Sequence, residues 1–284
     1  MDRFSKYNPK AVFLFFVFVI VLSLLLFHPV FLAISFMGSF LYKLKLDGKF
    51  VFSYFFKFIL PLILLTAVFN FLFTHYGQTI LFNLFEMNFT FEGLFYGFCQ
   101  GVMLGTVIMW FSAYSKVMTA DKLLCVFGRF LPNTALIFSM VLGFIPRLKK
   151  NIAEISDARL LIKNDESKLK KSISSFSALI TMTLEESISL SDSMKARGFG
   201  KGRTVYSKYR FSYKDFFLAF GAAVLAVTLM ILKIKGKTEF IFEPVMYMQS
   251  ISVAGVLLFA LLTFLPLIID LAEDMKWHFL KQKI

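Results

Sequence analysis

Charge, cysteine and histidine are scarce in this sequence, and the loop that binds nucleotide phosphates in many ATPases is missing. Only 17% of the 284 residues are charged, whereas 58% are hydrophobic and the mean hydropathy is +0.72. Soluble domains carry about a quarter of charged residues, so this composition excludes a soluble globular domain. The chain also lacks the pattern Gly-x-x-x-x-Gly-Lys-Ser/Thr, which excludes hydrolysis of a nucleotide through that loop.

The few cysteines and histidines are isolated from one another. Cys99 lies in an apolar segment and Cys125 in a basic one, so we expect neither a disulfide nor redox chemistry. His28, His75 and His278 are far apart in the sequence, and we interpret them as interfacial polar residues rather than metal ligands. No cofactor and no metal site is predicted.

Polar residues inside the apolar segments are too few for catalysis or for a transport path. A membrane-embedded enzyme places Asp, Glu or His within its spans, and these segments contain almost none. A channel or stand-alone carrier needs polar residues near the middle of the membrane, and only Asn70, Gln100 and Gln249 are candidates. We therefore expect a protein that is not an enzyme, with a stand-alone carrier as a minor alternative.

Long apolar runs and phenylalanine are abundant, with 39 Phe residues in the chain. About 20 mostly apolar residues cross a bilayer as a helix, and inside the bilayer each backbone N–H group must bond within its own segment. The runs therefore predict an all-α integral membrane protein with about six spans. The predicted spans are 11–27, 30–44, 51–73, 93–114, 216–232 and 246–269.

Basic residues predict which ends of the spans face the cytoplasm. They gather in four regions that share one side if there are six spans, namely 3–10, 43–49, 116–214 and 276–283. Residues 116–214 hold 18 Lys and Arg against 8 Asp and Glu, whereas residues 58–115 hold no Lys or Arg. Both termini and the central segment are therefore expected in the cytoplasm, although Lys233, Lys235 and Lys237 fall on the outer side.

Three regions follow from this pattern: a membrane region at 1–115, a cytoplasmic coupling-helix region at 116–214 and a second membrane region at 215–284. Apolar residues recur every three or four positions in the central region, which predicts two long amphipathic helices. These helices can pack against each other, against a partner protein or against membrane lipid. The first stripe is Ile145, Leu148, Ile152, Ile155, Arg159 and Ile162, and the second, on a helix over 172–197, is Ile173, Phe176, Ile180, Leu184 and Ile188.

The second helix is expected to end in the sequence SDSMKARGFGKGRT, residues 191–204. Gly198 suits the left-handed conformation that often follows the last helical residue. Arg197 in the last turn complements the negative end of the helix dipole. A capped helix end accounts for these two residues, but it does not account for the basic, glycine-rich tail that follows them.

This stretch resembles the signature of the transmembrane T component of energy-coupling factor (ECF) transporters. In that family a long cytoplasmic helix ends in Ala-Arg-Gly, followed by an aromatic residue, Gly and a basic run. The resemblance extends to YNPKAVFLFFVFVI and HPVFLAI near the start, and to FGRFLPNTALIFSMVLGFIPRLKKNIAEISDARL in the central region. It covers most of the chain, and the Ala-Arg-Gly helix end is its most specific element.

The resemblance implies a subunit that links two cytoplasmic ABC-type ATPases to a small substrate-binding membrane protein, the S component. Such a subunit lies in the cell membrane of a bacterium or archaeon and serves the ATP-driven uptake of a vitamin or a transition-metal ion. In the family, two helix-end arginines each dock into a groove on one ATPase. The second motif matches Ala196, Arg197 and Gly198, and the first matches Ala158, Arg159 and Leu160 or lies a few residues later, near Lys163.

Residues near the two motifs are expected to widen the contact with the ATPases; these are Lys195, Ile152, Ile155, Ile180 and Leu184. Membrane lipid is a further expected partner, and nucleic acid is not. The leading alternative function is a structural or lipid-associated membrane platform, because amphipathic helices with basic residues also bind membrane surfaces.

Overall fold

The computed structural model describes residues 4–73, 79–84, 87–128, 130–161, 167–199, 209, 211–236, 240–241, 247–248 and 252–281. Within these ranges the chain is helical apart from two short hairpins. It divides into two compact units. Unit 1 comprises Met1–Lys122 and Tyr209–Ile284, and unit 2 comprises the inserted segment Leu123–Lys208.

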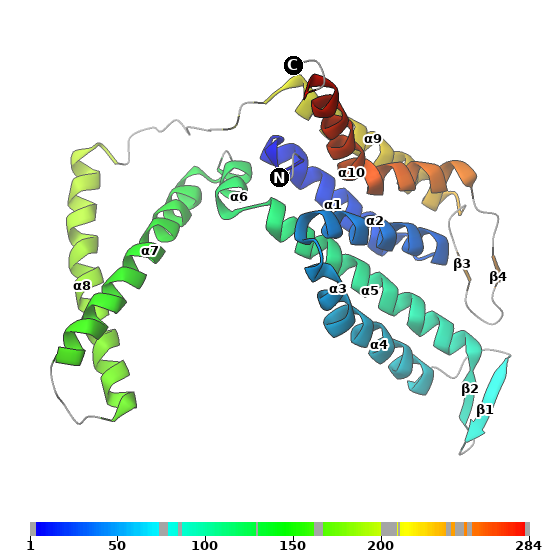
Figure 1. Ribbon diagram of the computed structural model, residues 1–284, viewed down its shortest axis with the longest axis horizontal. Helices are drawn as coiled ribbons and strands as arrows, with labels where there is room; N and C mark the ends of the chain where they lie inside the picture. Colours follow the sequence, from blue (N-terminus) through cyan, green and yellow to red (C-terminus); the bar gives the residue numbers. More distant parts are fainter. Residues whose placement is uncertain are drawn as a thin grey trace. The chain divides into compact units, whose positions relative to one another are not determined.

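Unit 1 is built from long apolar helices (Figure 1). A short 3-10 helix, η1 (Phe4–Lys6), precedes α1 (Pro9–Leu25), α2 (Pro29–Asp47), α5 (Phe91–Val117), α9 (Tyr213–Ile234) and α10 (Val253–Lys281). Between α2 and α5 the chain forms one composite segment of α3 (Phe50–Tyr54), a π-helix η2 (Phe55–Ile59) and α4 (Leu60–Phe73).

Among the described residues, five helical segments are long and apolar enough to cross a membrane: Pro29–Asp47, Phe50–Phe73, Phe91–Val117, Tyr213–Ile234 and Val253–Lys276. The helix α1 is apolar as well and has 17 residues. The chain is therefore a mostly helical membrane protein. Five of the six predicted apolar segments fall on these helices to within two residues, and most of the sixth falls on α10.

The predicted start of the last span, at residue 246, is wrong. Tyr247–Met248 form the strand β4, which pairs antiparallel with β3 (Phe240–Ile241), and α10 begins only at Val253. A short apolar strand and the start of an apolar helix have the same hydropathy, so the sequence pattern does not separate them. A second hairpin, of β1 (Ile80–Leu84) and β2 (Met87–Thr90), lies in the predicted loop between the third and fourth spans.

The first two long helices begin with the same local device, a side-chain cap followed by proline. Asn8 Oδ1 accepts a hydrogen bond from Lys10 N (3.1 Å), and His28 Nδ1 accepts one from Val30 N (3.2 Å). Proline then occupies the first helical position, where its missing N–H group costs nothing. Burial lowers the pKa of His28, which favours the neutral ring that can accept a bond. The structure thus makes His28 a buried helix cap.

Helices α4 and α5 pack closely along three glycines spaced four residues apart. A Cβ atom placed on Gly97 would lie 3.0 Å from the Ala67 Cα, and one on Gly101 would lie 2.9 Å from the Ile63 Cα. A Cβ on Gly105 would lie 3.0 Å from a methyl group of a neighbouring isoleucine. Small residues at this spacing let two helix backbones approach each other within a membrane.

A hydrogen bond crosses the same interface. Asn70 Nδ2 on α4 donates to Gln100 Oε1 on α5 (2.9 Å). Two of the three polar candidates for a transport path therefore bond to each other, and the third, Gln249, lies outside the described residues. A bond between two polar side chains satisfies both of them inside an apolar bundle.

Replacing Gly101 by Leu is expected to destabilise unit 1. The added side chain meets the α4 backbone, and overpacking of this kind costs about 1–3 kcal/mol. The measurement is the apparent melting temperature of the purified protein in detergent. Gly221→Leu is the matched control, because a Cβ on Gly221 of α9 meets nothing within 4 Å. Equal melting temperatures for the two variants would contradict the close packing of α4 and α5.

Candidate functional site

Unit 2 contains the two long helices that the sequence predicts in the central region. The helix α7 (Pro132–Leu161) runs through Pro146, so the apolar stretch at 134–145 and the amphipathic stretch after it form one helix. It contacts α8 (Lys168–Ala196), and the two helices run antiparallel (Figure 1). The shorter α6 (Ala120–Phe127) precedes them and begins at the end of unit 1.

The apolar stripe predicted on α8 stays exposed rather than packing against α7. Its exposed fractions lie between 42% and 67%, and the residue that α8 buries is Leu179. Across the helix pair, Asn151 Nδ2 donates to Glu186 Oε1 (3.4 Å). Exposed apolar surfaces of this extent are typical of sites that contact a partner or a membrane. We call this surface the α8 stripe: Ile173, Phe176, Ile180, Leu184 and Ile188.

The predicted contact residues on α7 are one exposed and one half-buried isoleucine. Ile152 is 51% exposed and Ile155 is half-buried. Ile155 is thus the more covered of the two, whereas every residue of the α8 stripe is exposed.

The second arginine motif lies at a well-defined helix end. The helix α8 ends at Ala196, Arg197 is the C-cap residue, and Gly198 has a φ of 81°. Gly198 N donates to Lys195 O (3.0 Å) and Phe199 N donates to Met194 O (3.0 Å), which is the Schellman pattern. The prediction of a left-handed Gly198 is confirmed. Ala196, Lys195 and the Arg197 side chain are all exposed.

The first arginine motif has a different environment. Arg159 is half-buried near the end of α7, where its Nη1 donates to Lys171 O (2.8 Å) and its Nη2 donates to Ser174 Oγ. Arg159 therefore connects the end of α7 to the beginning of α8 through hydrogen bonds. Ala158 is exposed, Leu160 is in the last turn of α7, and Lys163 lies outside the described residues.

Neither of these two bonds is predicted from the sequence, although α8 does offer a signal. Its first turns contain several serines, and a serine hydroxyl can accept a bond from an arginine. Only the antiparallel packing of α7 and α8 brings this serine face to Arg159.

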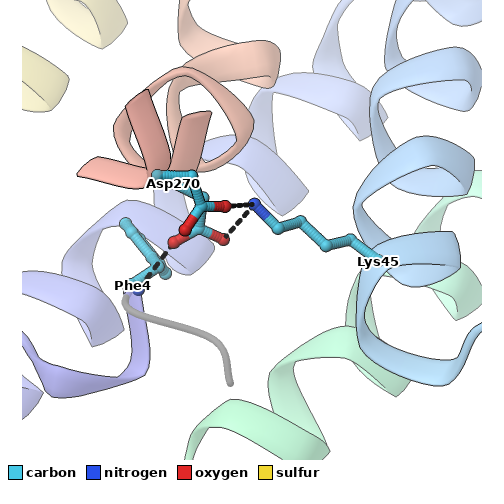
Figure 2. Close-up of polar contacts among 4 residues, drawn as sticks. Phe4, Lys45 and Asp270 are labelled. Atoms are coloured by element: carbon cyan, nitrogen blue, oxygen red, sulfur yellow. Dashed lines mark hydrogen bonds and ion pairs between the residues drawn. The ribbon is translucent and has the colours of Figure 1, made fainter. Parts of the chain in front are cut away.

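A second group of polar contacts lies in unit 1, where the last turn of α2, which contains Lys45, meets α10 and η1 (Figure 2). Asp270 on α10 is 1% exposed. Its Oδ1 accepts a bond from Phe4 N (3.1 Å), and its Oδ2 lies 3.3 Å from Lys45 Nζ on α2. Lys45 Nζ also lies 3.7 Å from Asp274, which is largely exposed. Burial and the nearby carboxylates raise the pKa of Tyr7, which keeps this phenol protonated.

The chain start is held by two more polar contacts. Asp215 accepts bonds from Asn8 N (2.8 Å) and from Ser212 N (2.8 Å), the latter as part of the capping box that begins α9. Lys122 Nζ on α6 donates to Ser5 O and Ser5 Oγ, each at 2.6 Å. Residues 4–8 are thus bonded to α6, α9 and α10. Asp215 and Asp270 are acids near the ends of apolar runs, a signal that the sequence analysis did not use.

Comparison with known proteins adds no further identification. A scan against protein-family models finds no match, and a search of curated proteins finds none either. Among the described residues, no group of three or more His, Cys, Asp and Glu side chains is placed to hold a metal ion. The class that the fold defines is a mostly helical membrane protein with an inserted unit of two long helices.

Replacing Asp270 by Asn is expected to lower the stability of unit 1. Asn keeps an acceptor for Phe4 N but removes the charge opposite Lys45, and a bond to a charged group contributes about 1.5–3 kcal/mol. The apparent melting temperature in detergent measures the loss. Asp274→Asn is the control, because an exposed ion pair contributes at most about 1 kcal/mol. An equal effect of both changes would show that burial of Asp270 does not matter.

Proposed function

We propose that this chain is the transmembrane T component of an ECF transporter. In this role it links two cytoplasmic ABC-type ATPases to a substrate-binding S component in the membrane. The observation that carries the proposal is the end of α8, where Arg197 is exposed on a helix closed by Gly198. The motif Ala196-Arg197-Gly198 and the basic run after it resemble the family's second docking motif.

The helix end suits docking for two physical reasons. A guanidinium group stays charged and can form two parallel bonds to a carboxylate of the partner. The Schellman bonds define the backbone on both sides of Arg197, so little ordering of the main chain is needed when the arginine binds. The α8 stripe offers an apolar surface on the same helix, with Ile180 and Leu184 in its middle.

The proposed mechanism is mechanical. ATP-driven closure of the two ATPases moves the docked helix ends, and the long helices carry this motion to the membrane spans. The S component then reorients and releases a vitamin or a transition-metal ion. Arg159 supports such transmission, because its bonds to Lys171 and Ser174 join α7 to α8. In this arrangement both termini and unit 2 face the cytoplasm of a bacterium or archaeon.

A membrane platform is the second candidate, favoured by the composition of the α8 stripe. Ile173 and Phe176 are 67% and 63% exposed, and Lys170 and Lys171 are exposed on the preceding turn. A surface of this kind can also adsorb to anionic lipid. The two candidates differ in whether Arg197 or the lysines of the first turns decide the binding.

Charge reversal at Arg197 tests the proposal. Arg197→Glu is expected to leave the protein in the membrane and to reduce the co-purifying ATPases at least about tenfold, because bonds of a charged group are lost. The measurement is affinity purification in mild detergent, with identification of two ABC-type ATPases and a small membrane protein by mass spectrometry. Substrate uptake by cells is expected to stop.

Lys170→Glu is the matched control, since Lys170 is an exposed basic residue at the opposite end of α8. It is expected to retain the ATPases. If the wild type brings down no ATPase and Lys170→Glu alone weakens the contact of α8 with anionic lipid in reconstituted vesicles, the platform function replaces the proposed one. Unchanged uptake in Arg197→Glu removes the arginine from the mechanism.

The position of the first docking motif is tested by charge reversal at Arg159 and at Lys163. We expect Arg159→Glu to reduce ATPase retention and Lys163→Glu to leave it unchanged. Because Arg159 also holds α8, Ser174→Ala serves as the control that removes one acceptor and keeps the arginine. An effect of Lys163→Glu alone would move the motif to 161–163. An equal loss in Ser174→Ala would make Arg159 a residue that only positions α8.

A further inference from the structure

A basic pocket of about 570 Å³ lies within unit 1, at the C-terminal ends of α2 and α5 and beside α3 and η2. Three lysines and one aspartate line it, which leaves a formal net charge of +2. We call it the basic pocket and define it by its polar residues: Lys43, Asp47, Ser53, Tyr54, Lys57, Ser112 and Lys116. None of these residues belongs to the proposed docking motifs.

Neighbouring side chains position two of the three ammonium groups of the basic pocket, those of Lys43 and Lys116. Lys43 is 2% exposed, its Nζ donates to Ser112 Oγ (2.7 Å), and the same Nζ lies 3.2 Å from the centroid of the Tyr54 ring. Lys116 forms an ion pair with Asp47. Lys57 is exposed at the edge. Ser112 and Tyr54 are neutral partners, so neither cancels the charge of Lys43 by forming an ion pair with it.

The basic pocket lies at the start of a long apolar segment that is mostly not buried by the rest of the protein. The segment Phe50–Phe73 has membrane-spanning length, and only 11% of its apolar window is buried. Phe58, which lines the pocket, is 51% exposed, and from two turns further along exposed apolar residues recur every three or four positions. This apolar strip consists of Phe58, Leu65, Val68, Phe69 and Leu72.

We propose that the basic pocket binds the headgroup of an anionic phospholipid, whose acyl chains lie along the apolar strip. Lysines hold a phosphate group as point charges, and basic pockets between membrane helices bind anionic headgroups. The net charge of +2 favours an anionic headgroup over a zwitterionic one. The apolar strip favours a lipid over a soluble phosphate, because only a lipid has both a headgroup for the basic pocket and acyl chains for the strip. The site is independent of the proposed transport role.

The test is a lipid titration of the delipidated, full-length protein in detergent, followed by native mass spectrometry. The probes are phosphatidylglycerol and phosphatidylcholine with identical acyl chains. We expect one phosphatidylglycerol to bind at least about fivefold more tightly than phosphatidylcholine. Lys57→Gln and Lys43→Met are each expected to weaken phosphatidylglycerol binding by about fivefold, the effect of one lysine near a lipid surface.

Lys49→Gln is the matched control, since Lys49 is exposed next to α3 and does not line the basic pocket. Lys57 is exposed, so Lys57→Gln keeps the test valid even if Lys43→Met fails to fold. Equal binding of the two lipids, or an equal loss in Lys49→Gln, would overturn the proposal in favour of diffuse attraction. Displacement of the lipid by millimolar inorganic phosphate would overturn it in favour of a free-anion site.

Discussion

Two buried carboxylates in unit 1 bind the start of the chain to helices that come more than 200 residues later. Asp270 accepts a bond from Phe4 N and Asp215 accepts one from Asn8 N, over separations of 266 and 207 residues. A buried carboxylate is costly unless it is bonded, so these contacts decide where the chain start lies against α9 and α10. Unit 2 is inserted between the two parts of unit 1, and the carboxylates join those parts into one body.

The two units differ in how their surfaces are used. In unit 1 the α4–α5 interface leaves no room for a side chain at Gly97 or Gly101, so the two helices pack closely. In unit 2 the α8 stripe stays exposed although it is as apolar as a core. Removing apolar surface from water is favourable. A partner or a membrane that covers the α8 stripe would therefore be stabilised by this burial. The proposed coupling function uses both properties.

Lysines that charge counting treats alike have distinct roles in the structure. Lys45 and Lys122 hold the chain start, one through Asp270 and the other through Ser5. Lys43 is buried beneath the basic pocket, and Lys49 is simply exposed. The excess of positive charge at this end of the spans predicts which side of the membrane it faces. It does not predict which lysine is structural and which can bind a lipid headgroup, because that depends on neighbours from other helices.

The sequence by itself determined the features that depend on neighbouring residues: the apolar helices, their membrane-spanning length and the left-handed Gly198 that closes α8. Only the tertiary structure decided which face of α8 packs, that Arg159 bonds to Ser174, and that Asp270 meets Phe4. Hydropathy and helix caps act within a few residues and can be read locally. Packing and buried ion pairs join residues far apart in the chain, so their partners are unknown until the helices are placed in space.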